Sequence, residues 1–370
     1  MIRYDKSLIE ILQKDTKIIE NDGLSIILKP SPGEERVGYL DPIEMSIMEE
    51  HWAGQKQREQ PTSPPSIEEI VSMIRESMGF PNLNLNTVEI HTKYEEITSG
   101  SGNKVGLWRY YPRKSYNKNR PAFLFFHGGG WLGGSVYTVE NFCKLIAELA
   151  DAVVFNVDYS LAPEKPYPNG INDSYSAVKH VYDNANDYGV NPNKISVGGD
   201  SAGGNLAAAL SLKARDEGLS MIAMQVLLYP AVLMGDVSVD GYEWREDDFE
   251  VSEEHADIIK NRCLSLGRPS KVEEDVILSS YITSTDLKDP YVNPALALSH
   301  EGLPKAIIVA AEFDGLRIQN EAYAKQLQAA GVDTTCYRYK GMTHAFIDKL
   351  GYLPQAEDLC MVIANELRDL

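Results

Sequence analysis

The sequence has few cysteines, little positive charge and no long apolar run. Its 370 residues include four widely separated cysteines and no C-x-x-C pair, so a zinc site or a thioredoxin-type site has no support. No stretch approaches the roughly 18 uninterrupted apolar residues of a membrane-spanning helix. The 35 basic residues against 54 acidic ones leave a net charge of -19, which repels nucleic acids and anionic lipids. We therefore expect no metal, no membrane span and no nucleic-acid partner.

The start of the sequence also lacks the features of a secretory signal. Arg3, Asp5 and Lys6 introduce charge where such a signal has its apolar core and cleavage site. We expect a cytoplasmic protein with free thiols, whose acidic surface serves solubility. A hydrophobic fraction of 43% supports a large core, and the length favours two or three domains or one large α/β domain with insertions.

The first 86 residues differ in pattern from the rest of the chain. They predict a helix near residues 41–55, a Pro-rich break at residues 61–65, and a second helix that begins at Ser66. Ser66 and Glu69 stand at the spacing of a capping box, in which each residue satisfies a backbone N–H of the other. We interpret residues 1–86 as an N-terminal helical segment and residues 87–370 as the main domain.

From residue 87 onward, strand patterns and helix patterns alternate, which predicts βαβ units and a mainly parallel sheet covered on both faces. Between Leu233 and Asp286 this alternation fails, and an acidic loop is followed by two helical patches; an insertion of this length is usually a functional lid or cap. Strands are predicted at 88–94, 104–111, 122–126, 152–158, 194–198, 224–229, 306–311 and 334–339, and helices at 138–149, 172–188, 202–215, 320–329 and 354–367.

A predicted strand runs into the motif G-x-S-x-G and then into a predicted helix. Residues 199–203 read Gly-Asp-Ser-Ala-Gly, with Ser201 at the centre. Small residues at Gly199 and Gly203 allow a sharp strand-to-helix turn that lifts the serine hydroxyl to the end of the sheet. The strand before and the helix after distinguish this nucleophile elbow from a plain glycine-rich turn.

A second motif, His-Gly-Gly-Gly-Trp at residues 127–131, follows the buried strand at 122–126 directly. Successive glycines leave backbone N–H groups accessible, which suits an oxyanion hole. A phosphate-binding loop is the rival interpretation, but the Lys and Ser/Thr of a P-loop and the spacing of a dinucleotide fingerprint are missing.

A serine hydroxyl needs an imidazole to take its proton and a carboxylate to orient that imidazole. His344 lies just after the last predicted strand, and Asp314 ends the strand before it. The chain order Ser201, Asp314, His344 is the order found in α/β-hydrolases. Glu312, on the same strand as Asp314, is the second choice for the acid.

Four stretches together make the sequence resemble the hormone-sensitive-lipase-like branch of the α/β-hydrolase esterases. They read His-Gly-Gly-Gly at 127–130, Tyr-Ser-Leu-Ala-Pro-Glu at 159–164, Gly-Asp-Ser-Ala-Gly-Gly at 199–204 and Gly-Met-Thr-His at 341–344. The resemblance covers most of the chain after residue 87. It implies an α/β-hydrolase fold with a helical cap built from the N-terminal segment and the insertion at about 233–286.

The resemblance also implies a role for each matching residue. Ser201 corresponds to the nucleophile, His344 to the base and Asp314 to the acid, while His127 corresponds to a residue that braces the glycine loop. The oxyanion hole implied by the resemblance consists of the backbone N–H groups of Gly129, Gly130 and Ala202.

Three residues depart from the family pattern. Ser160 stands where arginine is usual, which removes a charge partner for Glu164. Gly315 replaces a proline after the acid, and Ala345 replaces a glycine after the base. Proline at position 315 would preset the first turn of the helix that orients the acid, so glycine is expected to be looser there.

The sequence predicts the substrate pocket less clearly than it predicts the catalytic residues. Trp131 and Tyr229 are candidate walls, with ordinary core packing as the alternative. The same two interpretations stand for four apolar cap residues, which either face the site or only each other: Ile258, Ile259, Leu264 and Leu278.

The sequence thus predicts a cytoplasmic serine carboxylesterase without a cofactor, which hydrolyses short acyl esters through an acyl-enzyme. Its partner would be a small-molecule ester, and homodimerisation stays open. An amidase or an acyltransferase would use the same triad, because only the leaving group or the acceptor differs. A non-catalytic small-molecule receptor of the same fold is the remaining alternative, although such a receptor typically lacks the base.

Overall fold

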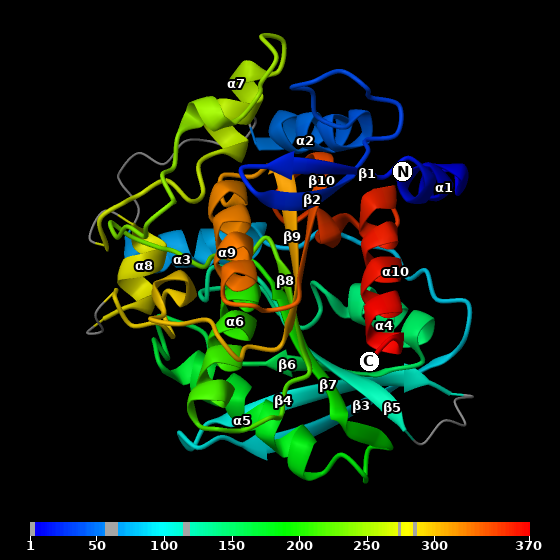
Figure 1. Cartoon of the computed structure of the whole chain (residues 1–370), viewed down its shortest axis with the longest axis vertical. Coiled ribbons are helices and arrows are strands. Elements are labelled where there is room, and N and C mark those ends of the chain that lie inside the picture. Colours follow the sequence, from blue (N-terminus) through cyan, green and yellow to red (C-terminus); the bar gives the residue numbers. More distant parts are fainter. Residues whose placement is uncertain (1–3, 56–65, 114–118, 273–274, 284–286) are drawn as a thin grey trace.

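A computed structural model describes residues 4–55, 66–113, 119–272, 275–283 and 287–370. Its centre is a ten-stranded sheet in the order β1-β2-β10-β9-β8-β7-β5-β6-β4-β3, mostly parallel from β2 to β6 (Figure 1). The predicted Pro-rich break at 61–65 lies outside the described residues. The strands are β1 Lys17–Asn21, β2 Leu24–Lys29, β3 Ile90–Thr98, β4 Lys104–Pro112, β5 Arg120–Phe126, β6 Val153–Asp158, β7 Val190–Asp200, β8 Met224–Leu228, β9 Lys305–Phe313 and β10 Thr334–Thr343.

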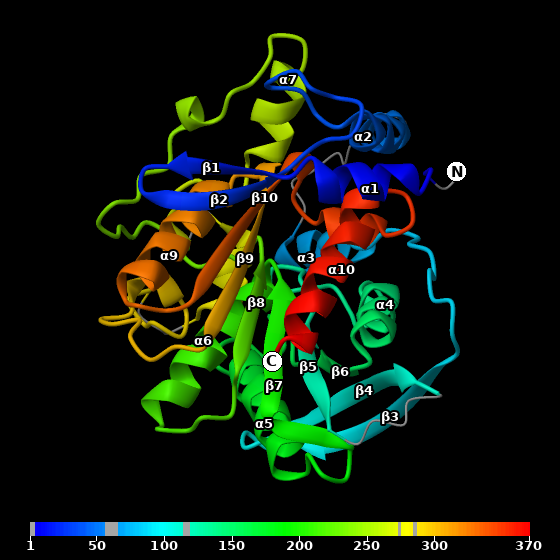
Figure 2. The same cartoon turned by 45° about the vertical axis from the view of Figure 1, so that its right-hand side comes forward.

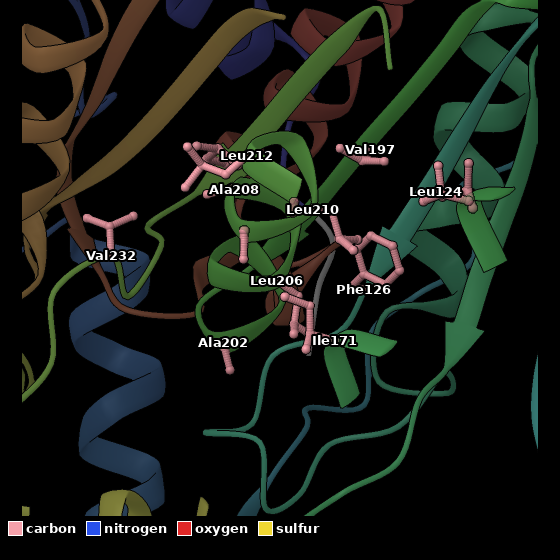
Figure 3. Close-up of a cluster of buried hydrophobic side chains, with 14 of the residues drawn as sticks. Leu124, Phe126, Ile171, Val197, Ala202, Leu206, Ala208, Leu210, Leu212 and Val232 are labelled. Atoms are coloured by element: carbon pink, nitrogen blue, oxygen red, sulfur yellow. The ribbon is translucent and has the colours of Figure 1, made fainter. Parts of the chain in front are cut away.

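Helices cover both faces of the sheet, as the alternation of patterns predicts. One apolar core lies under α5, α6 and α9, and a second lies under α4 and α10 (Figure 2). Figure 3 shows the first core, where Leu206 and Leu210 of α6 point toward Phe126 of β5 and Ile171 of α5. The helices are α1 Ser7–Lys14, α2 Pro42–Gln55, α3 Ile67–Ser77, α4 Glu140–Ala150, α5 Asn169–Asp183, α6 Ala202–Asp216, α7 Ala256–Ile258, α8 Val276–Tyr281, α9 Arg317–Ala329 and α10 Pro354–Arg368.

The N-terminal segment is only partly helical, so the prediction of a helical segment over residues 1–86 is wrong for part of it. β1 and β2 form an antiparallel hairpin, and β2 pairs in parallel with β10 at the edge of the sheet. Residues 24–29 form a strand because their alternating apolar residues, Leu24 and Ile26, are fully buried on one face. The predicted capping box is present, since Ser66 and Glu69 each accept the other's backbone N–H.

The insertion and the N-terminal segment meet each other in the structure. The Leu40 N–H donates to His255 Nδ1 at 3.1 Å, and the Ser252 N–H donates to the Gly38 carbonyl at 3.0 Å. In Figure 1, α2 lies close to α7 at the top of the view, and α3 lies close to α8 at mid-height. Within the described ranges, we find no helix that combines the length and the apolar character needed to cross a membrane.

Candidate active site

Ser201 lies at the sharp turn between β7 and α6, with φ +55° and ψ -117°. Such a backbone is costly for a residue with a side chain, on the order of 1–3 kcal/mol. The flanking glycines make the turn sterically feasible, because a Cβ at Gly199 would meet the Phe126 carbonyl oxygen at 2.4 Å and one at Gly203 would meet it at 1.9 Å. The G-x-S-x-G pattern therefore reflects close backbone packing that holds the hydroxyl at the sheet edge.

Ser201, His344 and Asp314 lie in a hydrogen-bonded row. His344 Nε2 is 2.9 Å from Ser201 Oγ, and His344 Nδ1 is 2.7 Å from Asp314 Oδ2. The three residues follow β7, β10 and β9, and the carboxyl ends of parallel strands share one edge of a sheet. The Leu316 N–H donates to the other oxygen of Asp314 at 2.9 Å, which fixes the carboxylate.

Glu312, the second choice for the acid, does not touch the imidazole. Its carboxylate accepts the N–H of Gly341 at 2.7 Å, and burial raises its pKa. The pKa of His344 has two opposing causes, since burial lowers it while the Asp314 carboxylate raises it. The net direction is upward, with smaller contributions from Asp200 and Asp348.

The glycine loop lies beside Ser201 and is held in place by Asp200. The Gly128 N–H donates to Asp200 Oδ1 at 2.8 Å. Gly129 and Gly130 have φ of +126° and +60°, and the N–H of neither appears as a donor among the loop and turn hydrogen bonds of the described residues. Ala202 is the first residue of α6, so its N–H has no acceptor within the helix.

His127 has the bracing position that the resemblance implies. Its ring stacks on Tyr159 with centroids 4.6 Å apart, and its Nδ1 lies 2.8 Å from the Gly128 carbonyl. Tyr159 Oη donates to the His127 carbonyl at 2.7 Å. Complete burial lowers the pKa of His127 to about 4, so the ring is a weak base, and its contacts are with the loop and Tyr159 and not with Ser201.

Two cavities meet at Ser201. The smaller, of about 100 Å³, lies under the cap and is lined by Trp131, Leu233 and Leu278 among others. The larger, of about 440 Å³, is lined by residues of α2 and α3, by the glycine loop and by His344. Of the two interpretations of Trp131, the structure therefore favours a cavity wall.

For Tyr229 and three of the four apolar cap residues, the structure favours the second of the two interpretations, packing away from the cavities. Tyr229 lines neither cavity: its fully buried ring lies edge-on to His344, with centroids 4.9 Å apart. Ile258, Ile259 and Leu264 pack in a separate core between the cap and β9, whereas Leu278 lines the smaller cavity. The sequence pattern alone does not separate apolar residues that face a cavity from those that face each other.

The structure explains two departures from the family pattern, at Ser160 and Gly315, in ways that the sequence analysis did not predict. Arg75 of α3 forms a two-point ion pair with Glu164, at 2.9 and 2.7 Å, and so supplies the charge that Ser160 lacks. A Cβ at Gly315 would meet the Leu266 carbonyl oxygen at 1.7 Å, and Trp244 Nε1 donates to the Gly315 carbonyl at 3.0 Å. Glycine at 315 is required by close packing of the cap, contrary to the looser turn expected.

α2 also contacts the loop that carries His344. Glu44 is completely buried, accepts a hydrogen bond from Thr343 Oγ1 and pairs with Lys349, whose Nζ lies 2.7 Å from Glu44 Oε2. Thr343 and Lys349 flank the segment that contains His344. No motif marks Glu44 in the sequence, because its partners lie about 300 residues away.

Comparison with known proteins identifies the fold family. A family model described as alpha/beta hydrolase fold matches residues 123–348. The chain belongs to the α/β-hydrolase family. It is 35% identical over 253 residues to an arylesterase of Saccharolobus solfataricus, an alignment that covers 68% of this chain and 76% of the relative. It is also 36% identical over 282 residues to the carboxylic ester hydrolase LipN of Mycobacterium tuberculosis, which covers 74% of this chain and 68% of that relative.

Solved structures lead to the same family. The hyperthermophilic esterase of the archaeon Pyrobaculum calidifontis superposes with a TM-score of 0.72 at 29% identity, covering 90% of this chain and 98% of that one. A solved arylesterase structure also gives a TM-score of 0.72 at 29% identity. The predicted fold and the predicted class, a carboxylic ester hydrolase, are confirmed.

Proposed function

We propose that this esterase hydrolyses short-chain acyl esters through an acyl-enzyme formed on Ser201. The observation that carries the proposal is the row of contacts from Ser201 Oγ through both ring nitrogens of His344 to Asp314. A neutral imidazole in that position takes the serine proton as the hydroxyl attacks the ester carbonyl. The buried Asp314 carboxylate stabilises the imidazolium that results and keeps the ring in the productive tautomer.

The developing oxyanion would be bound by backbone N–H groups of Gly129, Gly130 and Ala202. These groups lie next to Ser201 in a glycine-rich turn and at a helix N-terminus, where the dipole favours negative charge. His344 then passes its proton to the leaving alcohol, and water repeats the attack on the acyl-enzyme with His344 again as the base. The acid is released and the serine is regenerated.

The two cavities divide the substrate between them. The leaving alcohol must lie within reach of His344, which lines the larger cavity and not the smaller one. We therefore assign the alcohol to the larger cavity and the acyl chain to the smaller one. A volume of about 100 Å³ is smaller than the roughly 150 Å³ of a protein cavity that accepts benzene, which favours short acyl chains.

Amide cleavage and acyl transfer would use the same acyl-enzyme, so they differ from ester hydrolysis only in the leaving group or acceptor. The receptor alternative is disfavoured because His344 is present and lies in contact with Ser201. We also propose a cytoplasmic location, which the four buried cysteines with free thiols support.

The test is a panel of p-nitrophenyl esters from acetate to laurate, with one anilide for comparison. Acetate to hexanoate should be hydrolysed best, and activity should be unchanged by EDTA. Ser201→Ala should lower kcat by on the order of a millionfold while leaving the circular dichroism spectrum unchanged. An organophosphate that labels a serine other than Ser201, with loss of activity, would overturn the assignment.

A further inference from the structure

The larger cavity contains a carboxylate that the proposed mechanism does not use. Asp348 follows His344 by four residues and lines the cavity together with Ser201. No hydrogen bond and no ion pair to its side chain is present among the described residues. Asp348 is half-buried beside the cavity, and a carboxylate that is partly withdrawn from water is costly to ionise without a partner.

The neighbouring cation, Lys349, compensates Asp348 only in part. Lys349 lines the same cavity, but its ammonium group contacts both oxygens of the buried Glu44. The positive charge of Lys349 is therefore matched by a negative charge that is itself sequestered from the cavity. Asp348 faces the alcohol site without a counter-charge of its own.

The other polar side chains that line the cavity have partners. Asp200 accepts the Gly128 N–H, Thr138 donates to the Ser135 carbonyl, and Ser77 donates to the Ile74 carbonyl. Asp200 contributes a second negative charge. Burial and this charge raise the pKa of Asp348, while Lys349 and His344 lower it, and the net direction is upward. Once Asp348 has lost its proton, the alcohol side of the site is anionic.

The acyl side differs in this respect. Asp275 lines the smaller cavity, but its carboxylate accepts the N–H groups of Ile277 and Leu278 at the start of α8. Arg268 lines that cavity too and pairs with Glu246 at 3.3 Å. The charges on the acyl side are thus engaged, and selection by charge is confined to the alcohol side.

We infer that Asp348 is a specificity-determining residue that favours ester substrates with a cationic group on the alcohol. The inference rests on the proposed function, because it assigns the leaving alcohol to the cavity that His344 lines. A cation near Asp348 would supply the missing counter-charge, whereas an anionic alcohol would meet Asp348 and Asp200 together. The acetate of a quaternary-ammonium ethanol is the simplest substrate of the favoured class.

Two acetates of nearly equal shape test the inference. 2-(Trimethylammonio)ethyl acetate and 3,3-dimethylbutyl acetate differ in one atom, which is a charged nitrogen in the first and a neutral carbon in the second. The effect of shape therefore cancels in the ratio of their kcat/KM values. At pH 8 we expect kcat/KM to favour the cation by at least roughly tenfold, because unit charges near each other in a protein site attract even at an effective dielectric constant of about 20. Acid release is followed by pH-stat titration, and p-nitrophenyl acetate serves as the reference substrate.

Three variants identify the source of the preference. Asp348→Asn should bring the ratio of the two kcat/KM values close to one, and Asp348→Glu should keep most of the preference. Glu253→Gln removes one negative charge from an exposed position of the cap and should leave the ratio unchanged. A ratio that survives in Asp348→Asn, or falls equally in Glu253→Gln, would overturn the inference in favour of the overall acidic field.

The experiment also separates this inference from the proposed function. Wild-type protein that hydrolyses p-nitrophenyl acetate through Ser201 but shows no preference between the two acetates would refute the role of Asp348 alone. Wild-type protein that hydrolyses none of the three esters would refute the proposed function, and the inference with it.

Discussion

The catalytic edge of the sheet and the cap above it are built in opposite ways. Six non-glycine residues in the described part of the chain have a left-handed backbone, and four of them lie at the catalytic edge: Trp131, Ser201, Tyr229 and Ala345. Within the described residues of the insertion at 233–286, none does. Strain of this kind persists only where the surrounding structure fixes it firmly. The edge is therefore rigid enough to hold reacting groups at fixed distances.

The cap has far less internal structure to fix it. α7 has three residues and α8 has six, and both depend on contacts with distant parts of the chain. Trp131 stacks on Tyr281 of α8 with centroids 4.5 Å apart, and Leu266 approaches Gly315 closely. Such a region can change its lining without disturbing the sheet. We infer that the edge determines the reaction and the cap determines which substrates reach it.

After Ser201→Ala, a change of Asp314 should have the largest effect on activity, and it tests whether the edge of the sheet determines the reaction. Asp314→Asn should lower kcat about ten-thousandfold, because the amide stabilises the wrong tautomer of His344. Glu312→Gln, a matched change two residues earlier, should cost less than about tenfold, since Glu312 contacts Gly341 and not the imidazole. Steady-state hydrolysis of p-nitrophenyl acetate measures both. Comparable losses in the two variants would show that the edge acts as one structural unit and not through a specific acid.

The same difference explains what the sequence could predict. Ser201, Asp314 and His344 each directly follow a predicted strand, so the G-x-S-x-G motif and the chain order pointed to all three, which lie in hydrogen-bonding contact in the structure. The β1–β2 hairpin was missed because only two of its residues, Leu24 and Ile26, are buried on the core face. Arg75 was missed as the partner of Glu164 because the two are 89 residues apart and the pairing depends on how α3 docks.

The cap should control acyl length. Leu278 lines the acyl-side cavity, and Leu278→Ala should raise the ratio of kcat/KM for octanoate over acetate by roughly tenfold, which is within the range for small changes of pocket volume. Leu264→Ala removes the same atoms from a fully buried cap leucine that lines neither cavity near Ser201. Both variants should melt at lower temperature, but only the first should change the ratio. An equal change of the ratio in both variants would mean that acyl length depends on the cap as a whole and not on the residues that line the cavity.

The pH dependence should follow the edge and not the cap. His344 must be neutral to accept the serine proton, so kcat/KM is low at acid pH and rises as the imidazolium loses its proton. Asp314 raises the pKa of His344 against the effect of burial, and the midpoint should therefore lie above the ordinary histidine value of about 6.5. Profiles between pH 5 and 9 measure it. Leu278→Ala should have the same midpoint, and a wild-type midpoint at or below the ordinary value would contradict the role of Asp314.

The smallest effect concerns the strain at the catalytic edge. Ala345 follows the base with φ +59° and ψ +30°, a left-handed conformation that costs an alanine about 1–2 kcal/mol. Ala345→Gly removes this cost but gives the unfolded chain more freedom, which offsets about 0.4–1 kcal/mol. We expect the free energy of unfolding to rise by roughly 0.5–1 kcal/mol, as measured by urea denaturation. Ala329→Gly at the exposed end of α9, where the backbone is helical, should instead lower it by up to about 1 kcal/mol. Destabilisation by both glycines would mean that the strain at position 345 is already relieved by its surroundings, and the edge would then differ from the cap in rigidity alone.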